Sequence, residues 1–291
     1  MAEDRDEKKF TMAWKVIDHC IAESITEKKK LRSLKNHKDG GGKEKANLLS
    51  SYINDDDDEE QQDSHRQGST EFDKFLRDTA INFIFAGRDT TGAALIWFFW
   101  LICNNPVVES NILEELRSTP LGKQRSSSND LTIFDPEELS KLVYLHAALC
   151  ESLRLFPPLP FHHQAALRHE VLPSGHRVEA GTKILSSLYS RGRMERIWGM
   201  DCLEFRPERW ISEEGRVRHE PSCKFMSFGS GRRTCLGKEV AFTKMKAVVA
   251  AMVYNFQVQV LQGHVVEPKL SVILHMKNGL RVRIKRRAES W

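Results

Sequence analysis

At 291 residues, with 40% hydrophobic and 29% charged side chains, the chain is long enough for one large or two ordinary globular domains. Its six cysteines form no CxxC pair or regular framework, which argues against a secreted disulfide scaffold and against a zinc ribbon. We expect most of them to be inert buried thiols. The first ten residues are charged throughout and lack the apolar stretch of a secretory signal peptide.

The formal net charge of +4 conceals two short segments of opposite sign. Residues 28–45 hold eight Lys or Arg against two acids, and residues 54–63 hold seven acids and no Lys or Arg. The first segment could bind nucleic acid and the second calcium, but the surrounding Gly, Ser and Gln residues favour a solvated linker. We therefore predict a charged disordered linker over residues 36–70 and no nucleic-acid partner.

Helical periodicity dominates the first part of the chain. Apolar residues recur every three or four positions over 8–35, which predicts an amphipathic helix within a first segment, residues 1–35. From Phe72 to about Cys103 the pattern predicts one long helix, which ends before Pro106. Arg88 and Asp89 lie in the middle of its most apolar window, so we expect a buried helix and no membrane-spanning segment.

Helices and strands alternate further along. A helix is predicted over 138–156, because the two prolines that follow push the preceding residue out of the α region. Strand-like pieces with turn residues follow over 169–190, as in a small antiparallel sheet. A helix over about 238–255 and a closing strand over 280–285 complete the pattern, and the helix has an apolar face of Phe242, Met245, Val249 and Met252. The predicted fold class is mainly α with a minor antiparallel β-sheet.

A lone cysteine, Cys235, stands in the glycine-rich stretch SFGSGRRTCLGKEVAF, residues 227–242. A thiol binds metal as thiolate, which a helix N-terminus, backbone N–H groups and nearby cations stabilise. All three are expected here, because a helix begins just after Cys235, glycines permit a tight turn, and Arg232 and Arg233 supply positive charge. The residues by themselves leave a buried structural cysteine as the alternative.

Five residues of this loop, Phe228, Gly231, Arg233, Cys235 and Gly237, have the spacing F-x-x-G-x-R-x-C-x-G. The spacing resembles the haem-binding loop of the cytochrome P-450 family, the haem-thiolate monooxygenases. At average residue usage it would recur by chance in about one window in ten million. The resemblance implies haem b as cofactor, with Cys235 as the axial ligand of the iron and Arg233 as the partner of a haem propionate. Phe228 would pack beside the sulfur, and the glycines would make room for the porphyrin.

The long helix contains AGRDTT, residues 86–91, which is similar to the oxygen-activation motif A-G-x-D-T-T of the same family. The resemblance implies that Ala86 and Gly87 border a groove that admits O2, the co-substrate. It also implies that Asp89 and Thr90 form an acid–alcohol pair that relays protons. Without the resemblance, a kink or a cap would be the ordinary reading of such a sequence.

Two further segments agree with the family pattern and follow in the family's order. Glu151 and Arg154 lie three residues apart, on one face of a predicted helix. The segment FRPERW, residues 205–210, matches the family's arginine segment. The resemblance implies that Glu151, Arg154 and Arg209 form a buried ionic triad, whose role is structural.

The stretches GRMERIWGMDCLEFRPERWISEEG and SVILHMKNGLRV look like the plant enzymes that hydroxylate fatty acids and long-chain alkanes of the surface wax pathway. The resemblance implies insertion of oxygen into an aliphatic C–H bond of a small lipophilic substrate. It also implies electrons from NADPH through a P-450 reductase, and a place on the cytosolic face of the endoplasmic reticulum membrane. His162 and His163 lack a third ligand, so we expect them to be ordinary surface residues.

The resemblance covers residues 71–287, so we predict a haem-binding core at 71–291 and expect an N-terminally truncated P-450 fold, its C-terminal portion only. Residues 1–35 then look like a remnant of the substrate lid, and the apolar flank 96–100 should be partly uncovered. The alternative is a truncated paralogue without catalysis, or an incomplete gene model with impaired haem binding. The basic stretch 277–287 is either a solvated strand face or a surface that docks an acidic reductase or an anionic membrane.

Overall fold

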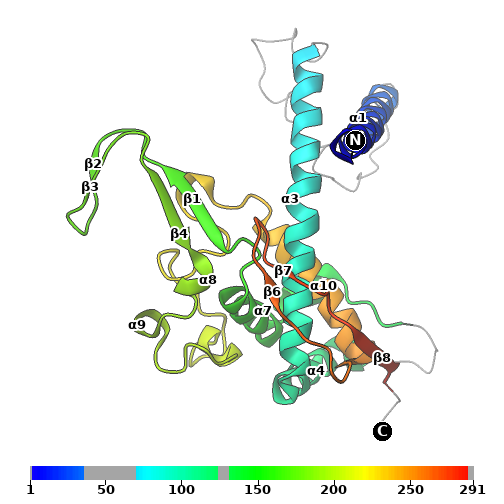
Figure 1. Ribbon diagram of the computed structural model, residues 1–291. Helices are drawn as coiled ribbons and strands as arrows, with labels where there is room; N and C mark the ends of the chain where they lie inside the picture. The colour runs from blue at the N-terminus through cyan, green and yellow to red at the C-terminus, as the bar shows by residue number, and fades with distance from the viewer. Residues whose placement is uncertain (1, 36–69, 124–130, 288–291) are drawn as a thin grey trace. The chain divides into compact units, whose positions relative to one another are not determined.

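A computed structural model of the chain describes residues 2–35, 70–123 and 131–287 (Figure 1). The chain divides into two units, Met1–Ala86 (unit 1) and Gly87–Trp291 (unit 2), with the division inside one long helix, α3 (Thr70–Cys103). The predicted linker lies outside the described residues except for Thr70, which begins α3.

Unit 1 pairs helix α1 (Ala2–Lys35) with the first half of α3 (Figure 1). The predicted helix over 8–35 is confirmed and begins six residues earlier than expected. Its core is small and consists of four buried residues, two on each helix. They are Ile21 and Ile25 on α1, and Leu76 and Ile81 on α3. The spacing of four residues places Ile21 and Ile25 on one face of α1, as the helical periodicity of the sequence predicts.

Helix α3 has 34 residues and confirms the predicted long helix. No single helix in the described part of the chain is long and apolar enough to cross a membrane. Helices α3 and α4 (Pro106–Ser118) meet that test only as a pair, and they are bent by 108° at the break between them. The flank 96–100 is partly uncovered as expected, because Ile96 is 37% exposed and Phe99 and Trp100 are half-buried. Trp97 and Phe98, by contrast, are buried, at 1% and 0% exposed.

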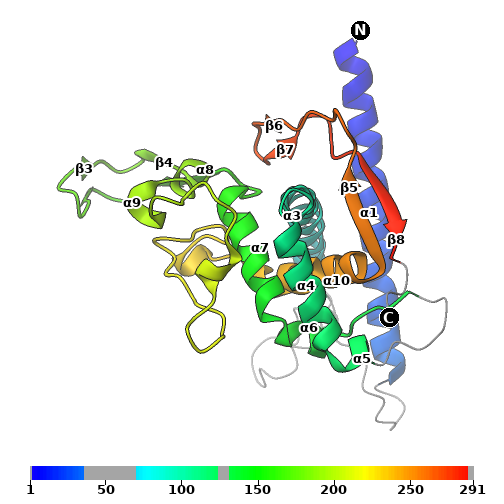
Figure 2. The same ribbon diagram turned by 90° about the horizontal axis from the view of Figure 1, so that it is seen from below.

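Helix α10 (Lys238–Asn255) contacts α4 and two helices described below, α6 and α7, within unit 2 (Figure 2). Its predicted bounds are confirmed. The predicted apolar face is buried at Phe242, Met245 and Val249, whereas Met252 is half-buried. The helix runs directly into strand β5 (Phe256–Val260).

The helix predicted over 138–156 is wrong in one respect, because the structure divides it into two. Helix α6 (Pro136–Lys141) ends before Leu142, and helix α7 (Val143–Leu155) begins directly after it. Leu142 is buried and has an extended backbone, with φ −72° and ψ 111°. The predicted stop before the two prolines is confirmed, since α7 ends at Leu155.

Two charged side chains hold this α6–α7 junction. The Glu115 carboxylate of α4 accepts hydrogen bonds from three successive backbone N–H groups at the start of α7, at 2.7–2.9 Å. The Lys246 ammonium of α10 donates to the carbonyls of Leu139 and Leu142, each at 2.9 Å. Helix ends leave such backbone groups without partners inside the helix. Glu115 and Lys246 supply those partners, and so they stabilise a break that the helical periodicity conceals.

All strand pairs among the described residues are antiparallel and two-stranded. They confirm the predicted fold class, mainly α with a minor antiparallel component. The sheet predicted over 169–190 corresponds to parts of two hairpins. The last strand, predicted to begin at residue 280, begins two residues later, at Val282. The pairs are β1 (Phe161–Ala165) with β4 (Lys183–Ser187), β2 (Glu170–Val171) with β3 (Arg177–Val178), β5 with β8 (Val282–Arg286), and β6 (Pro268–Lys269) with β7 (His275–Met276).

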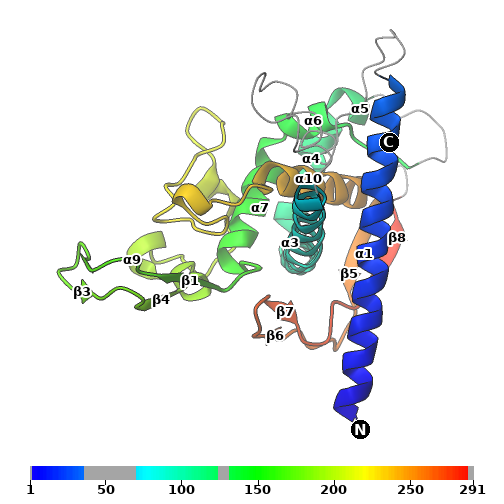
Figure 3. The same ribbon diagram turned by 90° about the horizontal axis from the view of Figure 1, so that it is seen from above.

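Among the described residues, five short helical turns lie between the longer elements. They are α5 (Pro120–Lys123), α8 (Leu188–Arg191), α9 (Glu195–Trp198) and the 3₁₀ helices η2 (Pro207–Trp210) and η3 (Gly231–Arg233). The mostly irregular chain over 211–237 runs beside α7 before it enters α10 (Figures 2 and 3). One side-chain bond fixes it there, from the Ser227 hydroxyl to the Leu153 carbonyl of α7 at 3.0 Å.

Candidate functional site

The loop around Cys235 is a tight turn that presents an exposed thiol. The Cys235 N–H donates to the Phe228 carbonyl at 2.8 Å and closes the turn. Gly229 and Gly231 have φ of 74° and 66°, a backbone conformation that residues with a Cβ rarely adopt. Cys235 itself is exposed. Gly231 of the motif and the neighbouring Gly229 are therefore favoured by the turn that brings the thiol to the surface.

An aromatic stack supports this turn from behind. The half-buried Phe228 ring packs on Phe242 of α10, with centroids 5.2 Å apart. Phe242 in turn stacks on the His146 ring of α7 at 4.3 Å. Burial, with a smaller effect from the nearby Lys246 charge, lowers the pKa of His146 to about 4, so this imidazole is uncharged at neutral pH. The stack connects the loop to the helical core.

A helix N-terminus and an arginine lie close to Cys235 in the chain. Gly237 caps the N-terminus of the 18-residue helix α10, and a Cβ added there would lie 4.0 Å from the Cys235 sulfur. Arg233 is exposed, and within the described ranges its guanidinium has no ion-pair or hydrogen-bond partner. An unpartnered Arg can bind a carboxylate of a ligand.

The AGRDTT segment lies on a separate element. Helix α3 continues without a break through residues 86–91. A Cβ built at Gly87 meets nothing within 4 Å, so the helix surface is open at this glycine. Ala86 is exposed, and the half-buried Asp89 lies 3.6 Å from the Arg88 guanidinium. The segment therefore offers an acidic group beside an open helix face.

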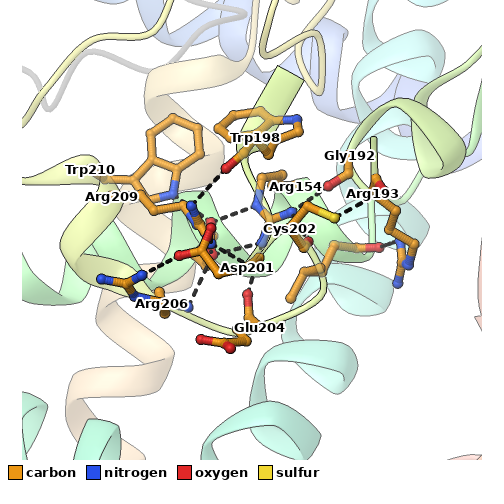
Figure 4. Close-up of polar contacts among 12 residues, drawn as sticks. Arg154, Gly192, Arg193, Trp198, Asp201, Cys202, Glu204, Arg206, Arg209 and Trp210 are labelled. Atoms are coloured by element: carbon orange, nitrogen blue, oxygen red, sulfur yellow. Dashed lines mark hydrogen bonds and ion pairs between the residues drawn. The ribbon is translucent and has the colours of Figure 1, made fainter. Parts of the chain in front are cut away.

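The structure brings Glu151, Arg154 and Arg209 together in one network (Figure 4). Arg154 donates to both oxygens of the Glu151 carboxylate at 2.7 Å, and the Nε of Arg209 donates to Oε1 at 3.1 Å. The side chains of Glu151 and Arg154 are 0% exposed and that of Arg209 is 13% exposed. Paired, bidentate geometry is what permits charges to be buried at this depth.

The two arginines also bind backbone carbonyls of residues 192–204 (Figure 4). Arg154 donates to the carbonyls of Gly192, Cys202 and Glu204, and Arg209 donates to those of Trp198 and Asp201. This stretch has only one short helix, α9, to order it. The network thus ties an irregular segment to α7, which is consistent with a structural role.

Two members of this network were missed from the sequence. Asp201 pairs with Arg209 at 2.8 Å and also with Arg206, and the hydrogen bond from Arg209 is the main cause that lowers the pKa of Asp201. The Trp210 indole N–H donates to Glu151 Oε2 at 2.8 Å. Charge balance could have indicated Asp201, because the predicted triad has two arginines and only one carboxylate. The need of a buried indole N–H for an acceptor could have indicated Trp210.

The remaining thiols and histidines are placed as follows. All six cysteines are free, and the expectation that most are buried is wrong, because only Cys150 and Cys202 are fully buried. His162 is half-buried and His163 is exposed, both on β1. Across residues 2–35, 70–123 and 131–287, no group of three or more His, Cys, Asp or Glu side chains is placed to hold a metal ion.

Comparisons with known proteins identify the family of the chain. The family model for cytochrome P-450 matches residues 2–282. Noroxomaritidine synthase 2 of Narcissus pseudonarcissus is 42% identical over 283 residues, which is 97% of this chain and 52% of that protein. Alkane hydroxylase MAH1 of Arabidopsis thaliana is 49% identical over 215 residues, which is 74% of this chain and 40% of that protein.

The fold has a counterpart among solved structures. A crystal structure of a cytochrome P-450, CYP102L1, superposes with a TM-score of 0.75 at 20% identity, and covers 98% of this chain and 58% of the other. The chain therefore spans about half the length of the curated relatives that it matches. With the family model matching nearly all of its residues and this fold shared, the chain belongs to the cytochrome P-450 family.

Proposed function

We propose that this protein is a haem-thiolate monooxygenase that inserts one oxygen atom of O2 into an aliphatic C–H bond of a fatty acid or long-chain alkane. The observation that carries the proposal is the Cys235 loop. Its thiol is exposed, lies at the start of α10, and has the unpartnered Arg233 two residues before it. A thiolate in that electrostatic setting is a fitting ligand for haem iron.

The residues around Cys235 fit a porphyrin. A Cβ at Gly231 would meet nothing within 4 Å, so the backbone surface there is open to a flat ligand. Leu236, next to Cys235, is 75% exposed, and an apolar ring laid on the loop would cover it. When bound, haem b supplies the oxygen activation that no side chain can provide.

The roles proposed for single residues follow from these positions. Cys235 donates a thiolate to the iron, and Arg233 pairs with a propionate carboxylate. On α3, Ala86 and Gly87 would border the groove that admits O2, and the Asp89 carboxyl and the Thr90 hydroxyl would form the pair that relays protons. Glu151, Arg154 and Arg209 act on the fold and not on the reacting atoms.

The substrate class rests on sequence similarity and on no contact within the structure. The 49% identity to an alkane hydroxylase over 215 residues supports a long aliphatic substrate. The match to noroxomaritidine synthase, which covers 97% of the chain, favours a second candidate, a substrate other than an alkane. Turnover of a long-chain alkane, a fatty acid and the precursor of noroxomaritidine, compared side by side, separates the candidates.

The electron donor and the location follow from the family alone. We propose that electrons come from NADPH through a P-450 reductase, and that the enzyme works at the cytosolic face of the endoplasmic reticulum membrane. Support for both comes from the similarity to plant members of the family. Reconstitution with and without a plant reductase, in the presence of NADPH, tests the first of these statements.

The central test concerns the ligand of the iron. The reduced, carbon monoxide-bound protein should show the Soret band of a thiolate-ligated haem, and Cys235→Ser should abolish it. Cys223→Ser is the matched control, because Cys223 is another exposed cysteine of the same irregular segment and should leave the band unchanged. Retention of the band in Cys235→Ser would overturn the assignment. A protein that takes up no haem would instead support a non-catalytic member of the family.

A further inference from the structure

We infer that Trp210 is a positioning residue that transmits the geometry of the buried ionic network to the segment leading into Cys235. Trp210 contacts the network on one side and that segment on the other. The expected effect on Cys235 as an iron ligand rests on the proposed function. The expected effect on the order of residues 218–236 does not.

The first contact is the hydrogen bond to Glu151. The Trp210 side chain is almost fully buried, with the residue 2% exposed, and its Nε1 donates to Glu151 Oε2 at 2.8 Å (Figure 4). The Arg154 Nε donates to the same oxygen, Oε2, whereas the Arg209 Nε and the Arg206 backbone N–H donate to Oε1. A hydrogen bond to a buried carboxylate is charge-assisted and directional. It therefore fixes the rotation of the indole as well as its position.

The second contact is with residues 218–225. The indole packs on the Phe225 ring with centroids 4.7 Å apart and the planes at 68°, an edge-to-face arrangement. The Trp210 carbonyl accepts the Arg218 N–H at 2.7 Å. One residue thus touches both ends of this stretch. Phe225 precedes Cys235 by ten residues, with Ser227 and Phe228 between them.

Two side-chain hydrogen bonds also tie this part of the chain to other elements: the Arg191 guanidinium donates to the Cys223 carbonyl, and the Ser227 hydroxyl donates to the Leu153 carbonyl at 3.0 Å. Between 211 and 237 the regular structure is one isolated bridge, between Ile211 and Val217, and the 3₁₀ turn η3. The Lys224 ammonium lies 4.6 Å from the Trp198 ring, and that ring also carries the Arg154 guanidinium at 5.1 Å. These cation contacts tolerate a range of geometries. Among the contacts of this segment, Trp210 is the one that also hydrogen-bonds to the Glu151 carboxylate of the network.

The test compares two substitutions with a matched control in the full chain. Trp210→Phe removes the indole N–H and keeps a ring, while Trp210→Leu removes both. Trp97→Phe is the control, because Trp97 is equally buried at 1% exposure and donates its indole N–H to the Leu274 carbonyl at 2.8 Å. Amide hydrogen exchange over 218–236 is measured in each protein, with the unfolding midpoint determined in parallel.

We expect Trp210→Phe to speed amide exchange over 218–236 by about fivefold, the effect of one hydrogen bond of typical strength, and Trp210→Leu to speed it further. Trp97→Phe should lower the unfolding midpoint and leave exchange over 218–236 within about twofold of wild type. Wild-type exchange in both Trp210 variants would overturn the inference. An equal increase in Trp97→Phe would overturn it as well, since the effect would then be general destabilisation.

A spectroscopic arm addresses the iron ligand. In the haem-loaded, reduced and carbon monoxide-bound protein, both Trp210 variants should lose the thiolate-type Soret band at a lower temperature than Trp97→Phe does. If wild type shows the band and the Trp210 variants retain it like the control, Trp210 does not position the ligand. If wild type shows no such band, the proposed function fails, while hydrogen exchange still decides the role of Trp210.

Discussion

At the scale of single residues, burial of polar groups determines how the site tolerates change. Glu151 accepts five hydrogen bonds, from Arg154 twice and once each from Arg206, Arg209 and Trp210. These hydrogen bonds stabilise the buried negative charge of the carboxylate. Removing one donor leaves part of that charge unsolvated, because the side chain is 0% exposed to water. The half-buried His146 is uncharged at neutral pH because the loss of solvation, and to a smaller extent the Lys246 charge, lowers its pKa.

His146 makes stability depend on pH. Its pKa is lowered from 6.5 in the unfolded chain to about 4 in the fold, mainly by burial. Between these values the unfolded state binds the additional proton, so its contribution to stability is complete above pH 6.5 and is lost as the pH falls toward 4. The loss should be on the order of 2 kcal/mol. His146→Phe keeps the stacking partner of Phe242 without titrating, and its unfolding free energy should fall less over this range.

Denaturant unfolding measured at pH 7.0, 6.0, 5.0 and about 4.5 checks this expectation. His163→Phe is the control, since His163 is exposed on β1 and should preserve the wild-type slope. An equal fall in stability for wild type and His146→Phe would show that other groups cause the pH dependence.

Thr90 gives a prediction about the reaction. If its hydroxyl donates a proton on the O2 side, Thr90→Ala should retain the reduced carbon monoxide spectrum and lower the product formed per O2 consumed by about tenfold or more. Thr91→Ala, one residue further along α3, is the matched control and should keep the wild-type ratio. Simultaneous measurement of O2 uptake and product decides it, and unchanged coupling in Thr90→Ala would remove this residue from the proton relay.

At the scale of elements, the α6–α7 junction shows how a helix break is stabilised from outside. Glu115 faces three N–H groups at the start of α7, where the helix dipole also favours negative charge. Lys246 binds the carbonyls at the other side of the break, although burial lowers the pKa of its ammonium. The junction matters for the site because α7 carries Glu151 and Arg154.

We expect Glu115→Gln to lower the free energy of unfolding by about 1–3 kcal/mol, because it removes a charge that satisfies three donors. Lys246→Met should cost less, since it also removes the penalty of burying an ammonium. Glu114→Gln, at the exposed neighbouring position of α4, should change stability by less than about 0.5 kcal/mol. Urea unfolding measures all three, and equal effects at Glu114 and Glu115 would refute the capping role.

At the scale of the whole molecule, the two units differ in how much core they contain. Unit 1 has a cluster of four buried hydrophobic residues, whereas the main cluster of unit 2 joins buried residues of α3, α4, α6, α7 and α10. Local stability follows buried apolar contact. We therefore expect the two units to lose their structure at different free energies, although α3 passes through both.

Hydrogen exchange resolved along the chain measures this difference. Amides of α1 and of the start of α3 should exchange at least about a hundredfold faster than those of α7 and α10. The two halves of α3 form the internal control, because they belong to one continuous helix with different cores. Uniform protection along α3 and α1, equal to that of α10, would contradict the expectation.

Much of this protein was predictable from local sequence. The long helices α1, α3 and α10 follow from periodicity over more than four turns each, where short-range spacing decides the outcome. The cysteine loop was predictable as well, since its glycines, cations and following helix lie within sixteen residues. The ionic triad required the resemblance to a family, because Arg209 is 58 residues from Glu151.

What the sequence by itself determined is therefore the local part: the helices, the turn at Cys235 and the residues around the thiol. The tertiary structure decided what depends on distant partners. The break at Leu142 exists because side chains of α4 and α10 reach it, and Trp97 and Phe98 are buried because other elements of unit 2 cover them. The roles of Asp201 and Trp210 arise in the same way, since a buried charge or indole takes its partner from whatever the fold brings within about 3 Å.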